Sequence, residues 1–206
     1  IEKRIKMPFS NVEKMLLNNG NLYACCWDTG CNKIYTIDPI SDKVKDSIIL
    51  AGAAPHSLVI DKNNTLWVLA GNAPKNINAS LTQINLTTKK IVKSYHFSKG
   101  VEAIKLCVNS TADKLFFIEV DYNGGNVNNG IFSMDISDNT LPATPLITCA
   151  IHQYFWALGI DPNANQIYVG DPKGFVQKGE LLIYDAEGNF IRKQTAGLGI
   201  SSFYFN

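Results

Sequence analysis

The chain of 206 residues repeats a short apolar segment that ends in Asp or Asn. The four copies cover residues 34–38, 81–85, 131–135 and 181–185, at steps of 47, 50 and 50 residues. A second apolar segment lies upstream of each copy, and a run rich in Asn, Asp, Gly or Ser precedes it. Self-similarity at a fixed period indicates one supersecondary unit that is used several times in tandem.

Each repeat predicts four short strands, A to D in chain order. The apolar segments 58–61, 106–109 and 158–161 open three of the units as strand A. Segments that alternate polar and apolar residues close them as strand D, at 43–49, 90–95 and 190–194. The turn-forming residues between segments indicate hairpins. No stretch of a dozen residues has apolar positions at helical spacing, which argues against a parallel sheet with crossover helices.

The repeat predicts an all-β protein, a β-propeller of four-stranded antiparallel blades. Four complete blades are expected, at residues 10–50, 56–95, 104–148 and 157–195. A β-sandwich of similar strands is the alternative, but the regular register of the Asp or Asn after strand C favours the propeller.

The two ends of the chain predict one further strand each. Residues 1–7 alternate like a strand D, and residues 202–206 match the strand A at 57–61. These flanking strands could share one blade that lacks strands B and C, because propellers commonly close their ring with strands from both ends. We therefore expect a single propeller domain over 1–206 that is the C-terminal part of a larger propeller.

Charge and motifs exclude several functions. A net charge of +1, with basic residues scattered, gives no reason to expect a nucleic acid partner. The chain has no nucleophile elbow, phosphate-binding loop or zinc-protease motif, so we expect neither an enzyme nor a cofactor. The five cysteines lack zinc-site spacing and favour free, mostly buried thiols, with a Cys26–Cys31 bridge as the alternative.

The candidate ligand-binding residues lie in the B–C and D–A loops, which open onto one face of a propeller and are the longest irregular segments here. Their aromatic rings and side-chain acceptors suit a bulky, polar, neutral ligand. The candidates are Trp27, Asp28, His56, Asn72, Asp121, Tyr122, Tyr154, Trp156, Asp171 and Phe175.

Structural roles compete with ligand binding at several of these positions. The repeated Asp or Asn that starts each B–C loop can cap its own loop instead of binding a ligand or calcium. His56 has no paired ligand spacing and favours a structural hydrogen bond. Residues 154–156 are three consecutive aromatics that cannot all point the same way in an extended segment, so at least one is expected to reach the face.

Seven segments of the chain carry a resemblance to a known family: residues 22–28, 33–38, 54–61, 66–72, 167–171, 175–180 and 203–206. Together they resemble the YncE-like, DUF5074-type propellers of gut Bacteroidetes. The resemblance implies a seven-bladed propeller, exported as a lipoprotein to the bacterial cell envelope, on the outer-membrane surface or in the periplasm. One branch of that family captures cobalamin and delivers it to a TonB-dependent outer-membrane transporter. A corrinoid such as vitamin B12 is therefore the expected ligand, and such a transporter a possible partner. The alternative is a protein-interaction or cell-envelope scaffold without a small ligand.

Overall fold

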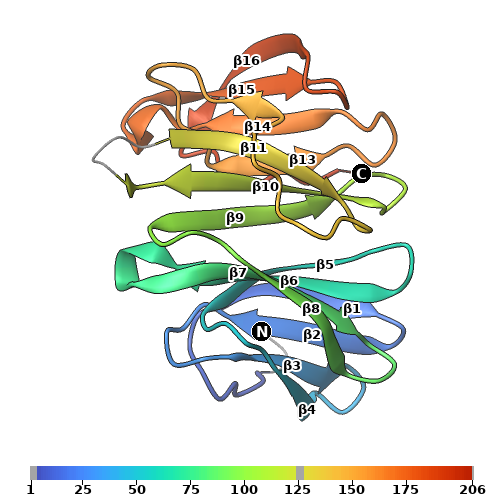
Figure 1. The fold of residues 1–206 in the computed structure, drawn as a ribbon. Coiled ribbons are helices and arrows are strands. Elements are labelled where there is room, and N and C mark those ends of the chain that lie inside the picture. Colours follow the sequence, from blue (N-terminus) through green and yellow to red (C-terminus); the bar gives the residue numbers. More distant parts are fainter. Residues whose placement is uncertain (1–3, 124–127, 206) are drawn as a thin grey trace. The chain divides into compact units, whose positions relative to one another are not determined.

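The computed structural model describes residues 4–123 and 128–205. The chain divides into two compact units, one up to Ala103 and one from Ile104 on. Each unit is built from four-stranded antiparallel sheets in which strands that follow one another in the chain lie side by side (Figure 1). The four sheets correspond to the four predicted blades.

The first unit holds two of the blades. The first blade has the order β1-β2-β3-β4, and the second has the order β5-β6-β7-β8. Their bounds are β1 Val12–Asn18, β2 Asn21–Cys26, β3 Lys33–Asp38, β4 Lys43–Ile49, β5 Pro55–Ile60, β6 Thr65–Asn72, β7 Ile77–Asn85 and β8 Lys90–His96.

The second unit holds the other two blades, and the boundary between the units falls inside strand β9. The third blade has the order β12-β11-β10-β9, and the fourth has the order β13-β14-β15-β16. Their bounds are β9 Val101–Val108, β10 Lys114–Asp121, β11 Asn128–Asp135, β12 Ile147–Thr148, β13 Ala157–Ile160, β14 Ile167–Asp171, β15 Lys178–Tyr184 and β16 Phe190–Leu198. The outer strand β12 is only two residues long and pairs with Gly130 and Ile131.

The repeated Asp or Asn after strand C closes the turn into strand D. The Oδ1 atom of Asp38 accepts a hydrogen bond from the Ile40 amide at 2.9 Å, and Oδ1 of Asn85 accepts one from the Thr88 amide at 2.9 Å. Asp185 accepts from the amide of Asn189 at 2.7 Å. A side chain that bonds to the backbone a few residues ahead fixes the turn, which explains why this residue type recurs in register.

Apolar residues on facing strands form the core of each unit. In the first unit, Leu66, Val68 and Ile84 of the second blade pack with residues of the first blade such as Ile34. In the second unit, Phe116 and Ile118 of β10 belong to one cluster with Val169 and Leu182 of the fourth blade. The strands therefore bury one face against the neighbouring blade of the same unit, as packed sheets do.

The strands predicted at the two ends of the chain are absent from the described residues, and residues 1–3 and 206 of the predicted segments lie outside them. Among the described residues, Arg4–Met7 and 202–205 lie in no strand. A strand exists only where it finds a partner to pair with, and neither segment is hydrogen-bonded into a sheet of the chain. Phe203 and Phe205 instead pack edge-on against Tyr168 of β14, with ring centres 5.9 and 5.2 Å apart.

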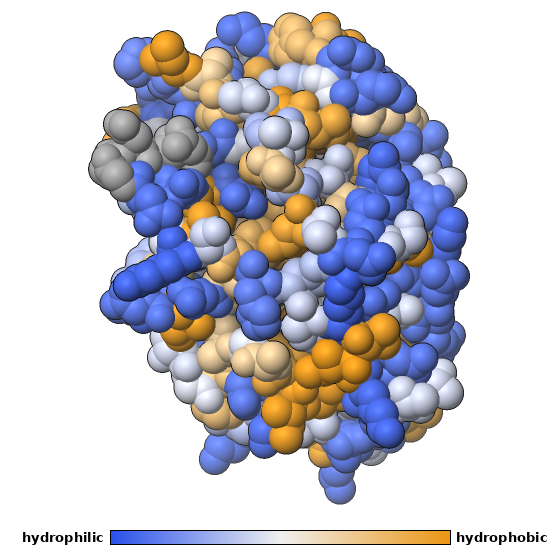
Figure 2. All heavy atoms as spheres, viewed as in Figure 1, coloured by the Kyte–Doolittle hydropathy of each residue, from blue (hydrophilic) through white to orange (hydrophobic). Residues whose placement is uncertain are grey.

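Within residues 4–123 and 128–205, helical structure is limited to single turns. The described residues include two 3-10 turns of three residues each, η1 Ala73–Lys75 and η3 Lys173–Phe175. In the described part of the chain, no helix has the length and apolar character needed to cross a membrane. On the face that Figure 2 shows, hydrophilic residues surround an apolar patch over the part of the first unit that Figure 1 draws with β3, β4 and β8. The outer strands of this unit expose large apolar side chains, among them Ile49 of β4 and Val92 of β8.

The five cysteines are free thiols, so the prediction that favoured free thiols over a Cys26–Cys31 bridge is confirmed. Cys25, Cys26 and Cys31 are buried in the first unit, while Cys107 and Cys149 of the second unit are partly buried. Burial raises the pKa of Cys25 to about 12 and those of Cys26 and Cys149 to about 11. At neutral pH these groups are therefore thiols rather than reactive thiolates.

Candidate ligand-binding site

Four of the predicted aromatic residues form a continuous row in the second unit. Tyr122 follows β10, Tyr154 and Trp156 lie in the connection from β12 to β13, and Phe175 ends η3. The hydroxyl oxygens of Tyr122 and Tyr154 lie 3.5 Å apart. The ring of Tyr154 stacks on that of Trp156 at 6.1 Å, and Phe175 meets Trp156 edge-on at 5.6 Å. This aromatic row offers ring surface to a ligand, because Tyr122 and Phe175 are 39% and 49% exposed.

Asn129 of β11 holds the aromatic row in place through Phe155. The buried Asn129 side chain accepts a hydrogen bond from the Phe155 amide at 2.7 Å and donates one to the Phe155 carbonyl at 3.3 Å. The Phe155 ring is fully buried, and neighbouring residues of an extended segment point the other way. The amide of Trp156 also donates to the Gly170 carbonyl of β14 at 2.9 Å. The row is thus anchored to both blades of the unit.

Asp171 fixes the turn that carries Phe175. Its Oδ1 atom accepts a hydrogen bond from the Lys173 amide at 2.9 Å, and its Oδ2 atom lies 2.9 Å from Lys173 Nζ. Lys173 also pairs with Glu180 at 3.1 Å, and Glu180 pairs with Lys193 at 3.2 Å. The hydrogen bond to Asp171 raises the pKa of Lys173, and the hydrogen bond from Lys173 lowers the pKa of Glu180. Asp171 is therefore already engaged in holding the loop.

The predicted site residues Trp27 and His56 lie in the first unit and join its two blades. The indole Nε1 of Trp27 donates a hydrogen bond to the Gly71 carbonyl at 3.0 Å. The Trp27 ring meets His56 edge-on at 5.9 Å, and His56 is 6% exposed with Nδ1 3.3 Å from Ser57 Oγ. Gly71 has a φ of 141° and lies so close to Ala79 that an added Cβ would be 2.7 Å from its Cα. Trp27 and His56 therefore make contacts that hold the two blades of the first unit together.

The acidic residues that start the B–C loops cap those loops, as the structural alternative predicts. Asp28 Oδ1 accepts from the Gly30 amide at 3.0 Å, and Asp121 Oδ1 accepts from the Asn123 amide at 2.8 Å. The bond from Gly30, with a second from Ser10, lowers the pKa of Asp28. Asn72 differs, since its side chain makes no capping bond to η1. Capping is confirmed at Asp28, Asp121 and Asp171.

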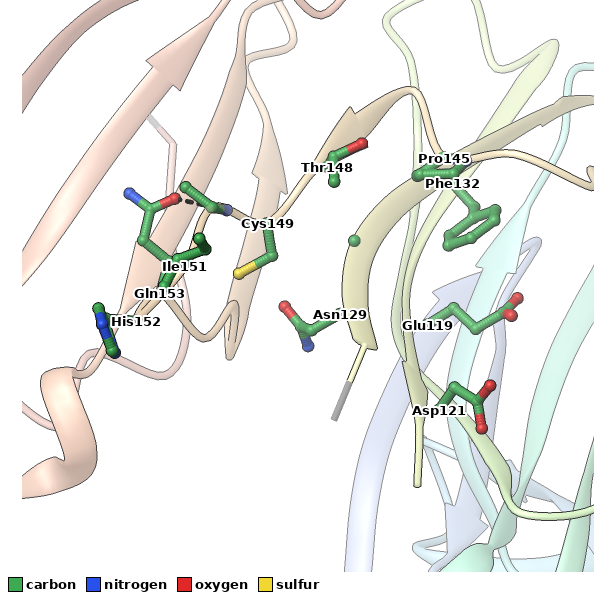
Figure 3. Close-up of a pocket in the computed structure, with 12 residues that line it drawn as sticks. Glu119, Asp121, Asn129, Phe132, Pro145, Thr148, Cys149, Ile151, His152 and Gln153 are labelled. Atoms are coloured by element: carbon green, nitrogen blue, oxygen red, sulfur yellow. Dashed lines mark hydrogen bonds between the residues drawn. The ribbon is translucent and has the colours of Figure 1, made fainter. Parts of the chain in front are cut away.

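A cavity of about 420 Å³ in the second unit is lined by Asp121 and Gln153, the residues that directly precede Tyr122 and Tyr154 in the chain. Glu119 and Asp121 of β10 contribute to its wall, together with Asn129 and the segment 148–153. Figure 3 shows the two carboxylates on one side of β11 and Asn129, Cys149 and Gln153 on the other. The polar groups therefore do not converge on one point. In the described ranges, no group of three or more His, Cys, Asp or Glu side chains could hold a metal ion.

Glu119 is expected to make the protein less stable as the pH rises. Burial, with a contribution from Asp121, raises its pKa from 4.5 to about 7. Below pH 4.5 Glu119 is protonated in both the folded and the unfolded chain. Between pH 4.5 and about pH 7, Glu119 is ionised in the unfolded chain but still largely protonated in the folded one. The free energy of unfolding therefore falls as the pH rises to about 7. Since the group is partly exposed, the loss is about 1–2 kcal/mol rather than the ~3.4 that the full shift implies.

Glu119→Gln should therefore be more stable than wild type at pH 8, by about 1–2 kcal/mol, and equally stable at pH 4. Urea unfolding followed by circular dichroism at both pH values measures this. Glu187→Gln, at an exposed turn position, serves as the control and should change stability by less than about 0.5 kcal/mol at either pH. An equal gain for Glu119→Gln at pH 4 and pH 8 would contradict the titration argument.

Sequence analysis missed two residues of this region. Lys105 of β9 lies with Nζ 5.8 Å from the centre of the Trp156 ring. Its signal was a single Lys inside the otherwise apolar segment 103–108. Asn129 lies in an Asn-rich run, where nothing marked it off from its neighbours.

Comparisons with known proteins identify the fold. No family model matches the chain, and no curated protein matches it either. Among solved structures, hydrazine synthase from Kuenenia stuttgartiensis is similar with a TM-score of 0.66 and 14% identity, over 89% of this chain and 61% of that one. The Dos1 propeller is similar with a TM-score of 0.62 and 15% identity, over 94% of this chain and 49% of that one. Dihydro-heme d1 dehydrogenase NirN in complex with DHE is similar with a TM-score of 0.62 and 12% identity, over 95% of this chain and 40% of that one.

These likenesses and the four sheets show that the chain is an all-β protein built of β-propeller blades. At such low identity they establish the fold alone. The chain spans 40–61% of the length of the three similar structures.

Proposed function

We propose that this protein is a non-enzymatic, ligand-binding β-propeller that captures a corrinoid such as vitamin B12. The aromatic row of Tyr122, Tyr154, Trp156 and Phe175 is the observation that supports this most directly. Its rings contact one another in sequence, and the rings at its two ends are partly exposed. Backbone hydrogen bonds of Phe155 and Trp156 attach the connection that carries the central rings to both blades of the unit. A large ring system can stack against several such side chains at once.

The place of action follows from the family resemblance in the sequence. We place the protein at the bacterial cell envelope, as an exported lipoprotein that hands its ligand to a TonB-dependent outer-membrane transporter. A protein-interaction or cell-envelope scaffold is the other candidate. The apolar patch on the first unit favours the scaffold, because exposed apolar patches mark many protein contacts (Figure 2).

Trp156→Ala should weaken corrinoid binding by about 10- to 100-fold, equivalent to about 1–3 kcal/mol. Trp156 touches both Tyr154 and Phe175, so its removal interrupts the row in the middle. Isothermal titration calorimetry of cyanocobalamin with the purified chain measures the affinity. Gel filtration gives a second test, since the coloured ligand should elute together with the protein. Phe175→Ala tests the end of the row and should give a smaller loss.

Tyr204→Ala is the matched control, since it removes an aromatic ring that is 88% exposed and lies outside the row. It should bind cyanocobalamin like wild type, and circular dichroism should show that all variants are folded. Wild-type affinity in Trp156→Ala and Phe175→Ala would place the binding site elsewhere. If wild type binds no corrinoid, the scaffold function becomes the better one.

A further inference from the structure

Two cysteines and a tyrosine form a small buried cluster in the first blade. Cys26 ends strand β2, Cys31 lies at the end of the loop that follows, and Tyr35 lies on β3. Both cysteines are fully buried, and Tyr35 is 5% exposed. The loop is tight, since the Asp28 amide donates a hydrogen bond to the Cys26 carbonyl at 2.8 Å. The Cys31 amide in turn donates one to the Asp28 carbonyl at 2.9 Å, so the two cysteines are held together.

The thiols of Cys26 and Cys31 contact each other. A side-chain hydrogen bond joins the two thiols, and another joins the Cys31 thiol to the Tyr35 hydroxyl. Cys31 Sγ also lies 3.5 Å from the Lys33 carbonyl. Cys25 precedes Cys26 on β2 but belongs to the core between the two blades of the unit, because neighbouring residues of a strand point to opposite faces. Cys26 and Cys31 are therefore a thiol pair that excludes Cys25.

The N-terminal segment covers this thiol pair. Met7 and Phe9 pack against the cluster, so Met7 brings a third sulfur atom to it. Phe9 lies beside the loop, since a Cβ added at Gly30 would be 3.3 Å from its Cε1 atom. Residues 4–10 lie in no strand, so their displacement breaks no pairing between strands. The thiol pair is thus closed to solvent by a segment outside the sheets.

Sulfur ligands and an apolar cover select a soft metal ion. Thiolates and thioethers favour copper(I), whereas carboxylates and water suit magnesium and calcium. Structural zinc takes four ligands, but the residues that the structure describes hold no metal-binding group of three or more His, Cys, Asp or Glu. Met7, Phe9 and Val44 pack around the pair, and such a shell controls solvent access and redox potential. A dry sulfur site therefore favours copper(I) over copper(II), which prefers nitrogen and oxygen ligands.

We infer that Cys26 and Cys31 form a binding site for a soft metal ion, copper(I). On binding, the two S–H bonds are replaced by two Cu–S bonds, and the two protons pass to the solvent. The thiol pair lies in the first unit and the aromatic row in the second, so this inference does not rest on the proposed corrinoid binding.

Competition with bathocuproine disulfonate measures copper(I) binding. The complex of this chelator with copper(I) is coloured, and the colour fades when the protein takes the ion. Under anaerobic conditions the reduced wild-type chain should take up a single copper(I) ion. Cys26→Ala and Cys31→Ala should each weaken the binding by about 100-fold, because one of the two thiolates is lost.

Cys149→Ala is the matched control, since it removes a partly buried thiol of the second unit. It should bind copper(I) with the affinity of wild type, and circular dichroism should show that all variants are folded. X-ray absorption spectroscopy of the loaded wild-type chain adds a test that needs no variant. The copper spectrum should show sulfur ligands only, because no nitrogen or oxygen ligand is part of the inferred site.

Several results would overturn the inference. The first is a wild-type chain that takes up no copper(I), and the second is undiminished binding in both Cys26→Ala and Cys31→Ala. Nitrogen or oxygen ligands in the copper spectrum, or zinc binding as tight as that of copper(I), would also contradict it. A chain that takes up no copper(I) but forms a Cys26–Cys31 disulfide with oxidised glutathione would have a redox pair in place of a metal site. Cyanocobalamin affinity should be the same in Cys31→Ala as in wild type, so the two proposals can fail separately.

Discussion

Asp61→Ala is expected to lower the free energy of unfolding by about 3–5 kcal/mol, the largest effect that we predict for a single substitution. Asp61 is 4% exposed, and its carboxylate accepts three hydrogen bonds. The amides of Asn63 and Thr65 donate to Oδ1 at 2.9 and 3.0 Å, and the indole of the fully buried Trp67 donates to Oδ2 at 2.8 Å. Alanine would leave a buried indole N–H and a turn without their acceptor.

Asp28→Ala is the matched control for Asp61→Ala. Asp28 also accepts hydrogen bonds, from the Gly30 amide and the Ser10 hydroxyl, but those bonds are exposed to solvent. Its loss should therefore destabilise the protein by less than about 1 kcal/mol. Urea unfolding followed by tryptophan fluorescence and circular dichroism measures both variants. Equal losses for the two would show that burial of the Trp67 bond does not set the effect.

Asn129→Ala should lower the free energy of unfolding by about 2–4 kcal/mol and also weaken ligand binding. The substitution removes both hydrogen bonds between the Asn129 side chain and the Phe155 backbone, which is buried and would be left without these partners. Because Phe155 lies between Tyr154 and Trp156, the connection from β12 to β13 would lose its anchor, and the aromatic row would lose its order.

Two measurements check the Asn129 prediction. Chemical denaturation gives the stability, and cyanocobalamin titration gives the affinity under conditions where the variant is still folded. Asn189→Ala, which removes an exposed turn bond to Asp185, should change stability by less than about 1 kcal/mol and leave affinity unchanged. A stability loss without any loss of affinity would show that Asn129 does not position the aromatic row.

The blade pattern was predictable because the same local chemistry recurs in three of the four blades. The Asp or Asn after strand C bonds to its own turn at Asp38, Asn85 and Asp185, so a sequence repeat corresponds directly to a structural one. The predicted grouping of Tyr122, Tyr154, Trp156 and Phe175 also has a simple origin. The B–C loops of the third and fourth blades and the D–A connection between these blades meet at the same end.

The remaining features depend on contacts that the local sequence does not encode. The hydrogen bonds between Asn129 and Phe155 join residues that lie 26 positions apart in the chain. Trp27 looked like a free aromatic of a loop, but a carbonyl 44 residues away, that of Gly71, accepts its indole hydrogen bond. The terminal segments have strand-like alternation, yet a strand also needs a partner edge.

The buried free thiols have a practical consequence as built-in kinetic reporters. A thiol whose pKa is raised to about 11 or 12 reacts with an alkylating reagent only when local opening exposes it. Cys25, Cys26 and Cys31 lie in the first unit, and Cys107 and Cys149 lie in the second. Because only the three thiols of the first unit are buried, mass spectrometry of labelled peptides over time can read the opening of that unit without introducing a single probe.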